Sequence, residues 1–165
     1  MPKVTSLGHM GLYVRDIERS VAFYRDILGM QVSDRSPRGS VFMTAQDRLR
    51  EHHELLLVPG RNDDGNANVI QQISFRCASL ADVKEFHRVF LKNNVKINRT
   101  CSHGNTVSIY FEDPDGNSVE VYWPTGIDVP QPFGPPIDVT KSEEEIMAEV
   151  KRLVAERGQQ PAAVT

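Results

Sequence analysis

Three polar side chains that could coordinate a ligand stand at related places in this sequence. His9 precedes the segment MGLYV, and Gln72 precedes the segment ISFRC 63 residues later. Glu120 lies inside NSVEVYW, between two valines, where an ionised carboxylate needs a partner that offsets its desolvation. His9 and Gln72 are equivalent positions of a repeat, so we expect their side chains to lie close together across a shared cleft. Taken singly, His9 fits a strand histidine that bonds the backbone, and Gln72 fits a surface amide equally well.

Further side chains that can move protons lie near these three in the sequence. The run EHHELLLVPG places His53 and Glu54 just before an apolar strand. Adjacent strand residues face opposite ways, so only one of the two enters a cavity, and the leucines that follow do not decide which. The run CSHGNTVSIYFEDPDGNSVE places His103 and Tyr110 ahead of Glu120. Both side chains can donate or accept a hydrogen bond, with ordinary loop and core positions as the alternative.

Alternation along NSVEVYW separates the residues around Glu120 into two faces. Glu120 and Tyr122 share one face, while the two valines share the other with Trp123. A polar inner face suits a ligand cavity. We take Tyr122 and Trp123 as candidate substrate-binding residues, with gap filling as the alternative for Trp123.

The elements that would position these residues form an internal repeat. The segments GHMGLYVRDIERSVAFYRDILGMQV and QQISFRCASLADVKEFHRVFLKNNV align when the sequence is shifted by 63 positions. Each shows strand alternation, then a helix-capping residue (Asp16 or Ser79), then apolar residues at helical spacing. Short strand candidates follow at 31–34, 40–44 and 54–58, and again at 96–100, 106–111 and 118–123, with a turn signal at DPDGN.

The pattern predicts an α+β fold with two tandem βαβββ units. We expect mixed sheets in a domain of residues 1–126, with units at about 5–60 and 68–124, enclosing one metal and substrate cavity. Residues 127–165 follow as a proline-rich linker and an amphipathic helix that begins with Ser142 and Glu145 in capping-box spacing. We expect this helix to pack on its own domain, with a second subunit as the alternative.

Composition narrows the functional class. The chain has 165 residues, a formal net charge of −3 and a pI near 5.9, which argue against nucleic-acid and membrane partners. No run of about 18 apolar residues is present, and the first residues do not have the pattern of a signal peptide. We therefore expect a cytoplasmic protein whose two cysteines, Cys77 and Cys101, are reduced.

The duplication, His9 and the run HGNTVSIYFEDPDGNSVE resemble the vicinal oxygen chelate superfamily. That group includes glyoxalase I, fosfomycin- and bleomycin-resistance proteins and type I extradiol catechol dioxygenases. The resemblance covers residues 7–126, and the run follows the extradiol signature up to its terminal Glu120. Cys101, two positions before His103, departs slightly from the small, apolar or amide residue of the signature. HHELLL also resembles the paired histidines of the dioxygenases.

The resemblance implies a divalent metal, Fe(II) first and Mn(II) as the alternative, in a site with open positions for substrate and O₂. Carried over by position, the metal ligands are His9, Gln72 and Glu120, the acid–base histidine is His53, and the substrate-contacting pair is His103 and Tyr110. Gln72 stands where the family has its second histidine. An amide oxygen is a harder donor than imidazole, so this departure favours harder ions such as Mn²⁺ or Mg²⁺.

The function implied is an extradiol dioxygenase of aromatic catabolism, which cleaves a catecholic ring with O₂ and forms a homodimer. One alternative is a glyoxalase-type isomerase or lyase that uses His9, Glu54, Gln72 and Glu120. A second alternative is a metal-free protein that binds a small molecule and confers resistance.

Overall fold

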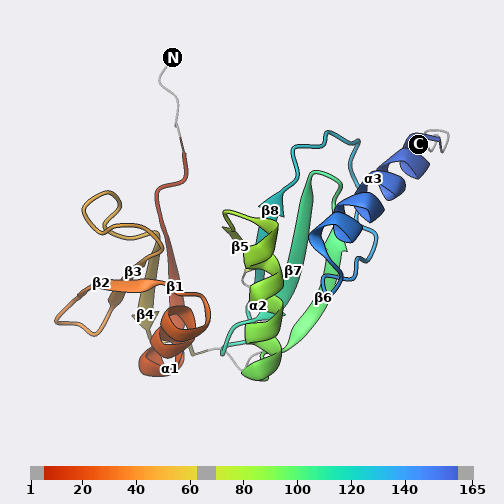
Figure 1. Ribbon diagram of the computed structural model, residues 1–165. Coiled ribbons are helices and arrows are strands. Elements are labelled where there is room, and N and C mark those ends of the chain that lie inside the picture. The colour runs from red at the N-terminus through yellow and green to blue at the C-terminus, as the bar shows by residue number, and fades with distance from the viewer. Residues whose placement is uncertain (1–5, 63–69, 160–165) are drawn as a thin grey trace, which may run out of the picture. The chain divides into compact units, whose positions relative to one another are not determined.

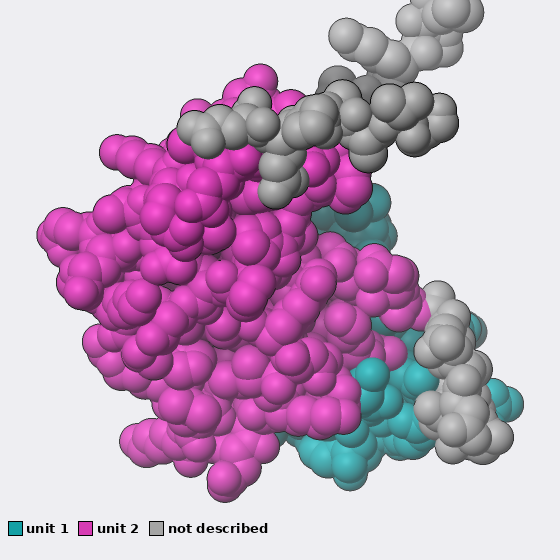
Figure 2. Space-filling view, turned by 90° about the vertical axis from the view of Figure 1, so that its right-hand side faces the viewer, with its two compact units in different colours: residues 1–69, 113–116 teal, residues 70–112, 117–165 magenta. Residues whose placement is uncertain are grey.

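The computed structural model describes residues 6–62 and 70–159, which fold into two compact units. One unit comprises Met1–Val69 with Asp113–Gly116, and the other comprises Ile70–Glu112 with Asn117–Thr165 (Figure 2). Each unit contains a mixed four-stranded sheet, and each is described by itself below. The start predicted for the second repeat, residue 68, lies outside the described residues. The single cavity expected from the sequence stays a prediction.

The first unit follows the predicted order of strand, helix and three strands. Its elements are β1 (Met10–Val14), α1 (Ile17–Ala22), a π-helical turn η1 (Phe23–Ile27), β2 (Gln31–Arg35), β3 (Val41–Thr44) and β4 (Leu55–Pro59). Asp16 caps α1 by accepting a hydrogen bond from the backbone N–H of Arg19, as the sequence predicts. The sheet order is β1-β4-β3-β2, and only the β1–β4 pairing is parallel.

The second unit repeats this order with longer elements. It contains β5 (Ile73–Arg76), α2 (Leu80–Lys92), β6 (Ile97–Ser102), β7 (Thr106–Glu112) and β8 (Ser118–Pro124), in the sheet order β5-β8-β7-β6. Ser79 and Asp82 form the predicted capping box at the start of α2. This helix lies across one face of the sheet (Figure 1), where its buried residue Phe90 packs against Phe111. The predicted βαβββ duplication is confirmed.

A segment after β8 covers the free edge of the second sheet. We call residues 131–137 the edge segment. Its Pro135 carbonyl accepts a hydrogen bond from the N–H of Ser102 at 3.0 Å, and the N–H of Ile137 donates to Thr100 O at 3.3 Å. An edge strand left open is a template for unwanted pairing, so this cover protects β6 and also fixes the loops beside it.

The last helix, α3 (Glu143–Gln159), packs within the second unit. It begins with the predicted capping box: the Ser142 N–H donates to the Glu145 carboxylate at 2.8 Å, and the Glu145 N–H donates to Ser142 Oγ at 3.2 Å. Ile146 and Val150 are fully buried on its apolar side. The expectation that this helix packs on its own domain is therefore confirmed for this unit.

The DPDG turn between β7 and β8, Asp113–Gly116, belongs to the first unit. The Asp115 side chain is fully buried, and it accepts hydrogen bonds from the backbone N–H and the guanidinium of Arg15, both at 3.1 Å. Arg19 adds a contact to Asp115 at 3.2 Å. The Tyr24 hydroxyl donates to the Asp113 carboxylate at 2.9 Å. The turn residues thus hold specific charged partners in addition to reversing the chain.

Both cysteines are free thiols in buried positions. Burial raises the pKa of Cys77 to about 12 and also raises that of Cys101, so both stay protonated at neutral pH. Within residues 6–62 and 70–159, none of the helices has the length and apolar character needed to cross a membrane.

Candidate active site

A row of polar residues crosses all four strands of the second sheet. The strand register pairs Ser74 with Glu120, Glu120 with Tyr110, and Tyr110 with Arg99. Directly opposed residues on neighbouring strands project from the same face, so these four side chains lie side by side. We call them the polar row. The valines that flank Glu120 are buried on the other face, which α2 covers.

Glu120 is buried and hydrogen-bonded within the polar row, beside Ser74 at its end. It is 6% exposed, and its Oε2 accepts hydrogen bonds from Ser74 Oγ at 2.6 Å and from Gln72 Nε2 at 3.3 Å. The Gln72 amide also reaches Ser74 Oγ at 2.9 Å, while the neighbouring Gln71 is exposed. The structure therefore brings together two of the three predicted ligands, Gln72 and Glu120. Ser74 was missed, although its place two residues after Gln72 puts it on the same face.

Tyr110 connects Glu120 to His103. The Tyr110 hydroxyl lies 3.1 Å from His103 Nε2, and Tyr110 is 7% exposed. Burial, followed by the hydrogen bond to the Glu120 carboxylate and its negative charge, raises the pKa of Tyr110 to about 12. The phenol is therefore protonated at neutral pH, as a proton donor must be.

The backbone of the edge segment fixes which nitrogen of His103 carries a proton. His103 Nδ1 lies 2.5 Å from the Phe133 carbonyl oxygen, which can only accept, so Nδ1 must carry the hydrogen. In the neutral ring Nε2 then accepts from the Tyr110 hydroxyl. In the protonated ring Nε2 donates to that hydroxyl, whose own proton turns to Glu120. The single phenolic proton of Tyr110 therefore points either to His103 or to Glu120.

The first unit gathers the other predicted histidines. The rings of His9 and His53 have centroids 4.3 Å apart, and His53 Nδ1 lies 2.9 Å from His52 Nδ1. Partial burial, then the charges of His9 and His52, lower the pKa of His53. A lowered pKa keeps His53 neutral at physiological pH and able to accept a proton.

Glu54 serves the first unit as a structural acceptor. Its carboxylate accepts hydrogen bonds from the Ala45 N–H at 2.8 Å and from Gln46 Nε2 at 2.9 Å. Glu54 is also not the repeat equivalent of Glu120. In the second sheet Ser74 pairs with Glu120, and the equivalent pair in the first sheet is Gly11 with Leu56. Leu56, rather than Glu54, therefore holds the position that corresponds to Glu120. His53 is the residue of this pair that lies against His9.

The two aromatic candidates on β8 divide between the faces of the sheet. Tyr122 follows Glu120 on the same face, where it pairs with Ser108. Trp123 pairs with the buried Val107. Because the register of β7 and β8 is continuous, Trp123 projects from the face opposite Glu120. The structure thus brings Tyr122, but not Trp123, to the side of the polar row.

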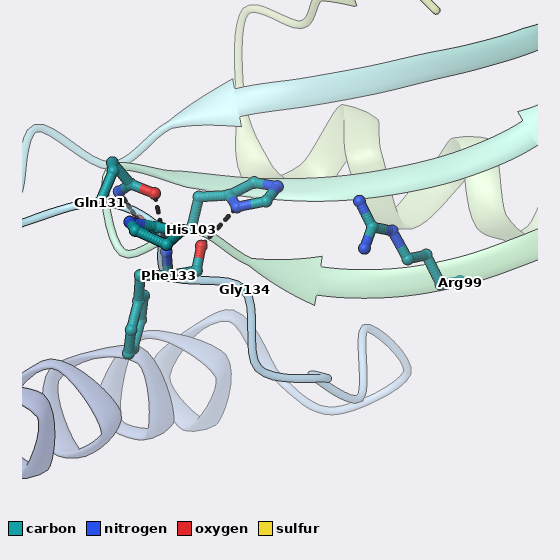
Figure 3. A pocket seen from close by; sticks show the side chains of 6 residues that line it. Arg99, His103, Gln131, Phe133 and Gly134 are labelled. Atoms are coloured by element: carbon teal, nitrogen blue, oxygen red, sulfur yellow. Dashed lines mark hydrogen bonds between the residues drawn. The ribbon is translucent and has the colours of Figure 1, made fainter. Parts of the chain in front are cut away.

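A pocket that the sequence did not reveal lies at the other end of the polar row. This edge pocket, of about 700 Å³, is lined by six residues: Arg99, His103, Gln131, Pro132, Phe133 and Gly134 (Figure 3). Gln131 Nε2 donates to the backbone carbonyl of His103 at 2.8 Å. Arg99 and the edge segment meet only through tertiary pairing, so no local signal in the sequence marks them as neighbours of His103.

Two oxygen donors of the second unit suit a divalent cation. The buried Glu120 carboxylate and the Gln72 amide lie within hydrogen-bonding distance, and rotating the amide by half a turn presents its carbonyl oxygen in place of its nitrogen. Carboxylate and carbonyl oxygens favour Mg²⁺, Ca²⁺ and Mn²⁺. Among the residues that the structure describes, no three His, Cys, Asp or Glu side chains are gathered as a metal site. Gln72 and Glu120 therefore suit a divalent metal ion, but they supply only part of its ligand set.

Comparison of the sequence with models of known protein families identifies the family to which this chain belongs. Residues 6–121 match the model of the Glyoxalase/Bleomycin resistance protein/Dioxygenase superfamily. The match covers more than half of the chain, and the chain belongs to this superfamily. The resemblance drawn from the sequence is confirmed.

Curated relatives include ring-cleaving enzymes. The chain is 26% identical over 138 residues to a 1,2-dihydroxynaphthalene dioxygenase of Pseudomonas sp. strain C18, covering 80% of this chain and 43% of that protein. It is 29% identical over 136 residues to a manganese-dependent 2,3-dihydroxybiphenyl 1,2-dioxygenase of Geobacillus genomosp. 3, covering 81% and 40%. The chain thus spans about two fifths of the length of these relatives.

Solved structures with this fold have other functions. A lactoylglutathione lyase from Agrobacterium tumefaciens superposes with a TM-score of 0.58 at 25% identity, covering 74% of this chain and 96% of that one. The fosfomycin resistance protein FosX from Listeria monocytogenes, in complex with Mn(II) and sulfate, gives a TM-score of 0.61 at 21% identity, covering 75% and 94%. The fold therefore does not by itself decide the reaction.

Proposed function

We propose that this protein is a metal-dependent extradiol dioxygenase that cleaves the ring of a catechol-type aromatic with O₂ and acts as a homodimer. The observation that carries the proposal is the continuous Glu120–Tyr110–His103 chain on one face of a sheet. It joins a buried carboxylate, which suits a metal, to a protonated phenol and an oriented imidazole, which suit an oxygenated substrate. Dioxygenases among the curated relatives support the same reaction class.

In this proposal His9, Gln72 and Glu120 hold the metal. An ion bound there supplies Lewis-acid activation of two vicinal oxygens and electron exchange with O₂. The two oxygen donors, Gln72 and Glu120, favour Mn(II) over Fe(II) more than two histidines and one carboxylate would. Ser74 orients Glu120 through its 2.6 Å hydrogen bond, so the carboxylate keeps one lone-pair direction for the ion.

The protein's own acids and bases would then manage the protons of the substrate. His53, neutral because its pKa is lowered, accepts a proton from one substrate hydroxyl. Tyr110 and His103 form a donor pair that supplies a proton to the oxygen that becomes anionic during ring opening. Phe133 keeps Nδ1 of His103 occupied, so that Nε2 faces Tyr110. The product contains both oxygen atoms of O₂ in a ring-opened hydroxy-dienoate.

Oxygen uptake tests this proposal. Protein loaded anaerobically with Fe(II) or Mn(II) should consume one O₂ per catechol and form a yellow product with at least one member of a catechol panel. Glu120→Gln should abolish uptake, while Glu112→Gln, on the same sheet but paired with Lys96, should retain it. Absence of uptake and of yellow product with either metal would refute the dioxygenase assignment.

A second candidate is a metal-dependent isomerase or lyase that needs no O₂. Gln72 favours it, because an amide ligand suits a harder ion that serves only as a Lewis acid. The similarity to the lactoylglutathione lyase points the same way. Under anaerobic conditions, metal-loaded protein that converts a thiohemiacetal of a 2-oxoaldehyde, but leaves catechols intact, would establish this candidate instead.

A further inference from the structure

We propose that the edge pocket binds a carboxylate substituent of the substrate, with Arg99 as the residue that selects it. The inference rests on the proposed function, because it assigns the substrate class of that same site. It names an aromatic diol that carries a carboxylate on the side of the ring away from its hydroxyl groups.

Arg99 is the one permanent cation among the residues that line the edge pocket. Its neighbours there are the apolar Pro132, Phe133 and Gly134, together with Gln131, whose amide nitrogen is occupied by the His103 carbonyl. Figure 3 shows the Arg99 guanidinium directed toward His103. A cation beside apolar walls and a neutral amide provides a site for an anion, because none of the six residues that line the pocket carries a carboxylate.

Arg99 is held in place without being neutralised. Its guanidinium carbon lies 4.2 Å from the centroid of the Tyr110 ring, a cation–π contact, and a side-chain hydrogen bond to Tyr110 uses part of its set of five N–H donors. In the described part of the chain, Arg99 forms no ion pair with a carboxylate. Arg88 and Arg152 of the same unit behave differently, since they pair with glutamates on their own helices. An arginine stacked on an aromatic ring is pre-organised for bidentate carboxylate binding.

The spacing from Glu120 fits an aromatic ring. Glu120 and Arg99 stand on β8 and β6 with β7 between them, in register through Tyr110. Two strand spacings separate their backbones by about 9.5 Å. A diol oxygen near Glu120 would therefore leave the opposite substituent of the ring near Arg99. Tyr110, between the two, would lie beneath the ring.

Charge supports a carboxylate over a neutral substituent. A substrate anion close to the buried Glu120 meets like-charge repulsion, and the Arg99 cation at the far end of the polar row offsets it. A charge-assisted hydrogen bond of this kind should raise affinity roughly 10- to 150-fold. Uncharged diols would gain nothing from Arg99.

Binding measurements test the inference without relying on turnover. Anaerobic calorimetry compares 3,4-dihydroxybenzoate with 4-methylcatechol, which replaces the carboxylate by a methyl group, on Mn(II)-loaded and on metal-free protein. Arg99→Met should reduce the preference for the carboxylate at least about tenfold and change 4-methylcatechol affinity less than about twofold. Arg88→Met, which removes an equal charge from an exposed position on α2, should leave the preference intact.

Two outcomes would overturn the inference. In the first, the unaltered protein and Arg99→Met show the same preference for 3,4-dihydroxybenzoate over 4-methylcatechol. In the second, Arg99→Met loses the same factor of affinity for both ligands. If Arg99→Met does not fold, Arg99→Lys takes its place: it keeps the charge but loses the planar fork, and an unchanged preference there would count against Arg99. A carboxylate preference that depends on Arg99 in a protein without O₂ uptake would retain the pocket and reject only the dioxygenase.

Discussion

Removing the Tyr110 hydroxyl tests the polar row by a property that needs no substrate. Tyr110→Phe deletes one buried hydroxyl that contacts both His103 and Glu120, and it leaves the ring beneath Arg99. A hydrogen bond to a charged partner contributes about 1.5–3 kcal/mol to stability. The raised pKa sets how much stability the unaltered protein loses at high pH: a shift from 10.0 to about 12 corresponds, at about 1.36 kcal/mol per unit, to a loss of roughly 2.7 kcal/mol once the phenol ionises.

The pH dependence of this loss has a definite sign. Because the pKa of Tyr110 is raised in the folded protein, its contribution is fully present below pH 10 and disappears as the pH rises toward about 12. Tyr110→Phe should therefore lower the free energy of unfolding by about 2–3 kcal/mol at pH 7 to 9. The difference from the unaltered protein should shrink above pH 10. Urea unfolding followed by fluorescence of Trp123, the only tryptophan in the sequence, reports on the second unit.

Tyr13→Phe is the matched control for this experiment. Tyr13 is 66% exposed on β1, so the same chemical change should cost less than about 0.5 kcal/mol. If Tyr110→Phe costs no more than Tyr13→Phe, or if its cost is unchanged between pH 9 and pH 12, the assignment of Tyr110 as a buried donor to Glu120 is wrong.

Three further substitutions probe other parts of the structure. Gln72→His should raise affinity for Fe(II) relative to Mn(II) by at least about tenfold in metal titrations, since it supplies a softer donor; an unchanged ratio would mean that residue 72 is not a ligand. Gly134→Ala would place a Cβ 3.3 Å from His103 Cε1 and displace the imidazole by a few tenths of an ångström. This displacement should lower kcat about threefold to fivefold with little loss of stability. An unchanged kcat would contradict the role of Gly134 in positioning His103. Asp115→Ala removes the buried carboxylate that pairs with Arg15 and Arg19. Because both arginines are partly exposed to water, the free energy of unfolding measured in urea titrations should fall by only about 2–3 kcal/mol. A loss under about 0.5 kcal/mol would show that these ion pairs contribute little to stability.

The fold could be predicted because its signals are local and occur twice. The shift of 63 residues aligns β1 with β5 and Asp16 with Ser79, and both capping residues act as their positions indicate. Strand bounds depend on hydrogen bonds made at a distance, so β6 extends to Ser102, beyond the predicted end at Thr100. The edge segment was predicted as a linker, because proline content conceals its pairing with β6.

The candidate site could be predicted only as far as the repeat and the family resemblance extend. The repeat paired Gln72 with His9, the family resemblance grouped Gln72 with Glu120, and the structure places Gln72 and Glu120 in contact. Arg99 was missed because its relation to Tyr110 depends on the register of β6, which is interrupted between Ile97 and Arg99. A bulge of this kind changes which face a residue occupies, and alternation in the sequence does not reveal it.

Metal binding by Glu120 tests the central claim most directly. Titration with Mn(II), followed by electron paramagnetic resonance of the free ion, should show one site per chain in the unaltered protein. Glu120→Gln should weaken that site by at least about tenfold, while Glu112→Gln should leave it unchanged. Equal Mn(II) binding by the unaltered protein and Glu120→Gln would contradict the account, since the buried carboxylate of the polar row would then hold no metal.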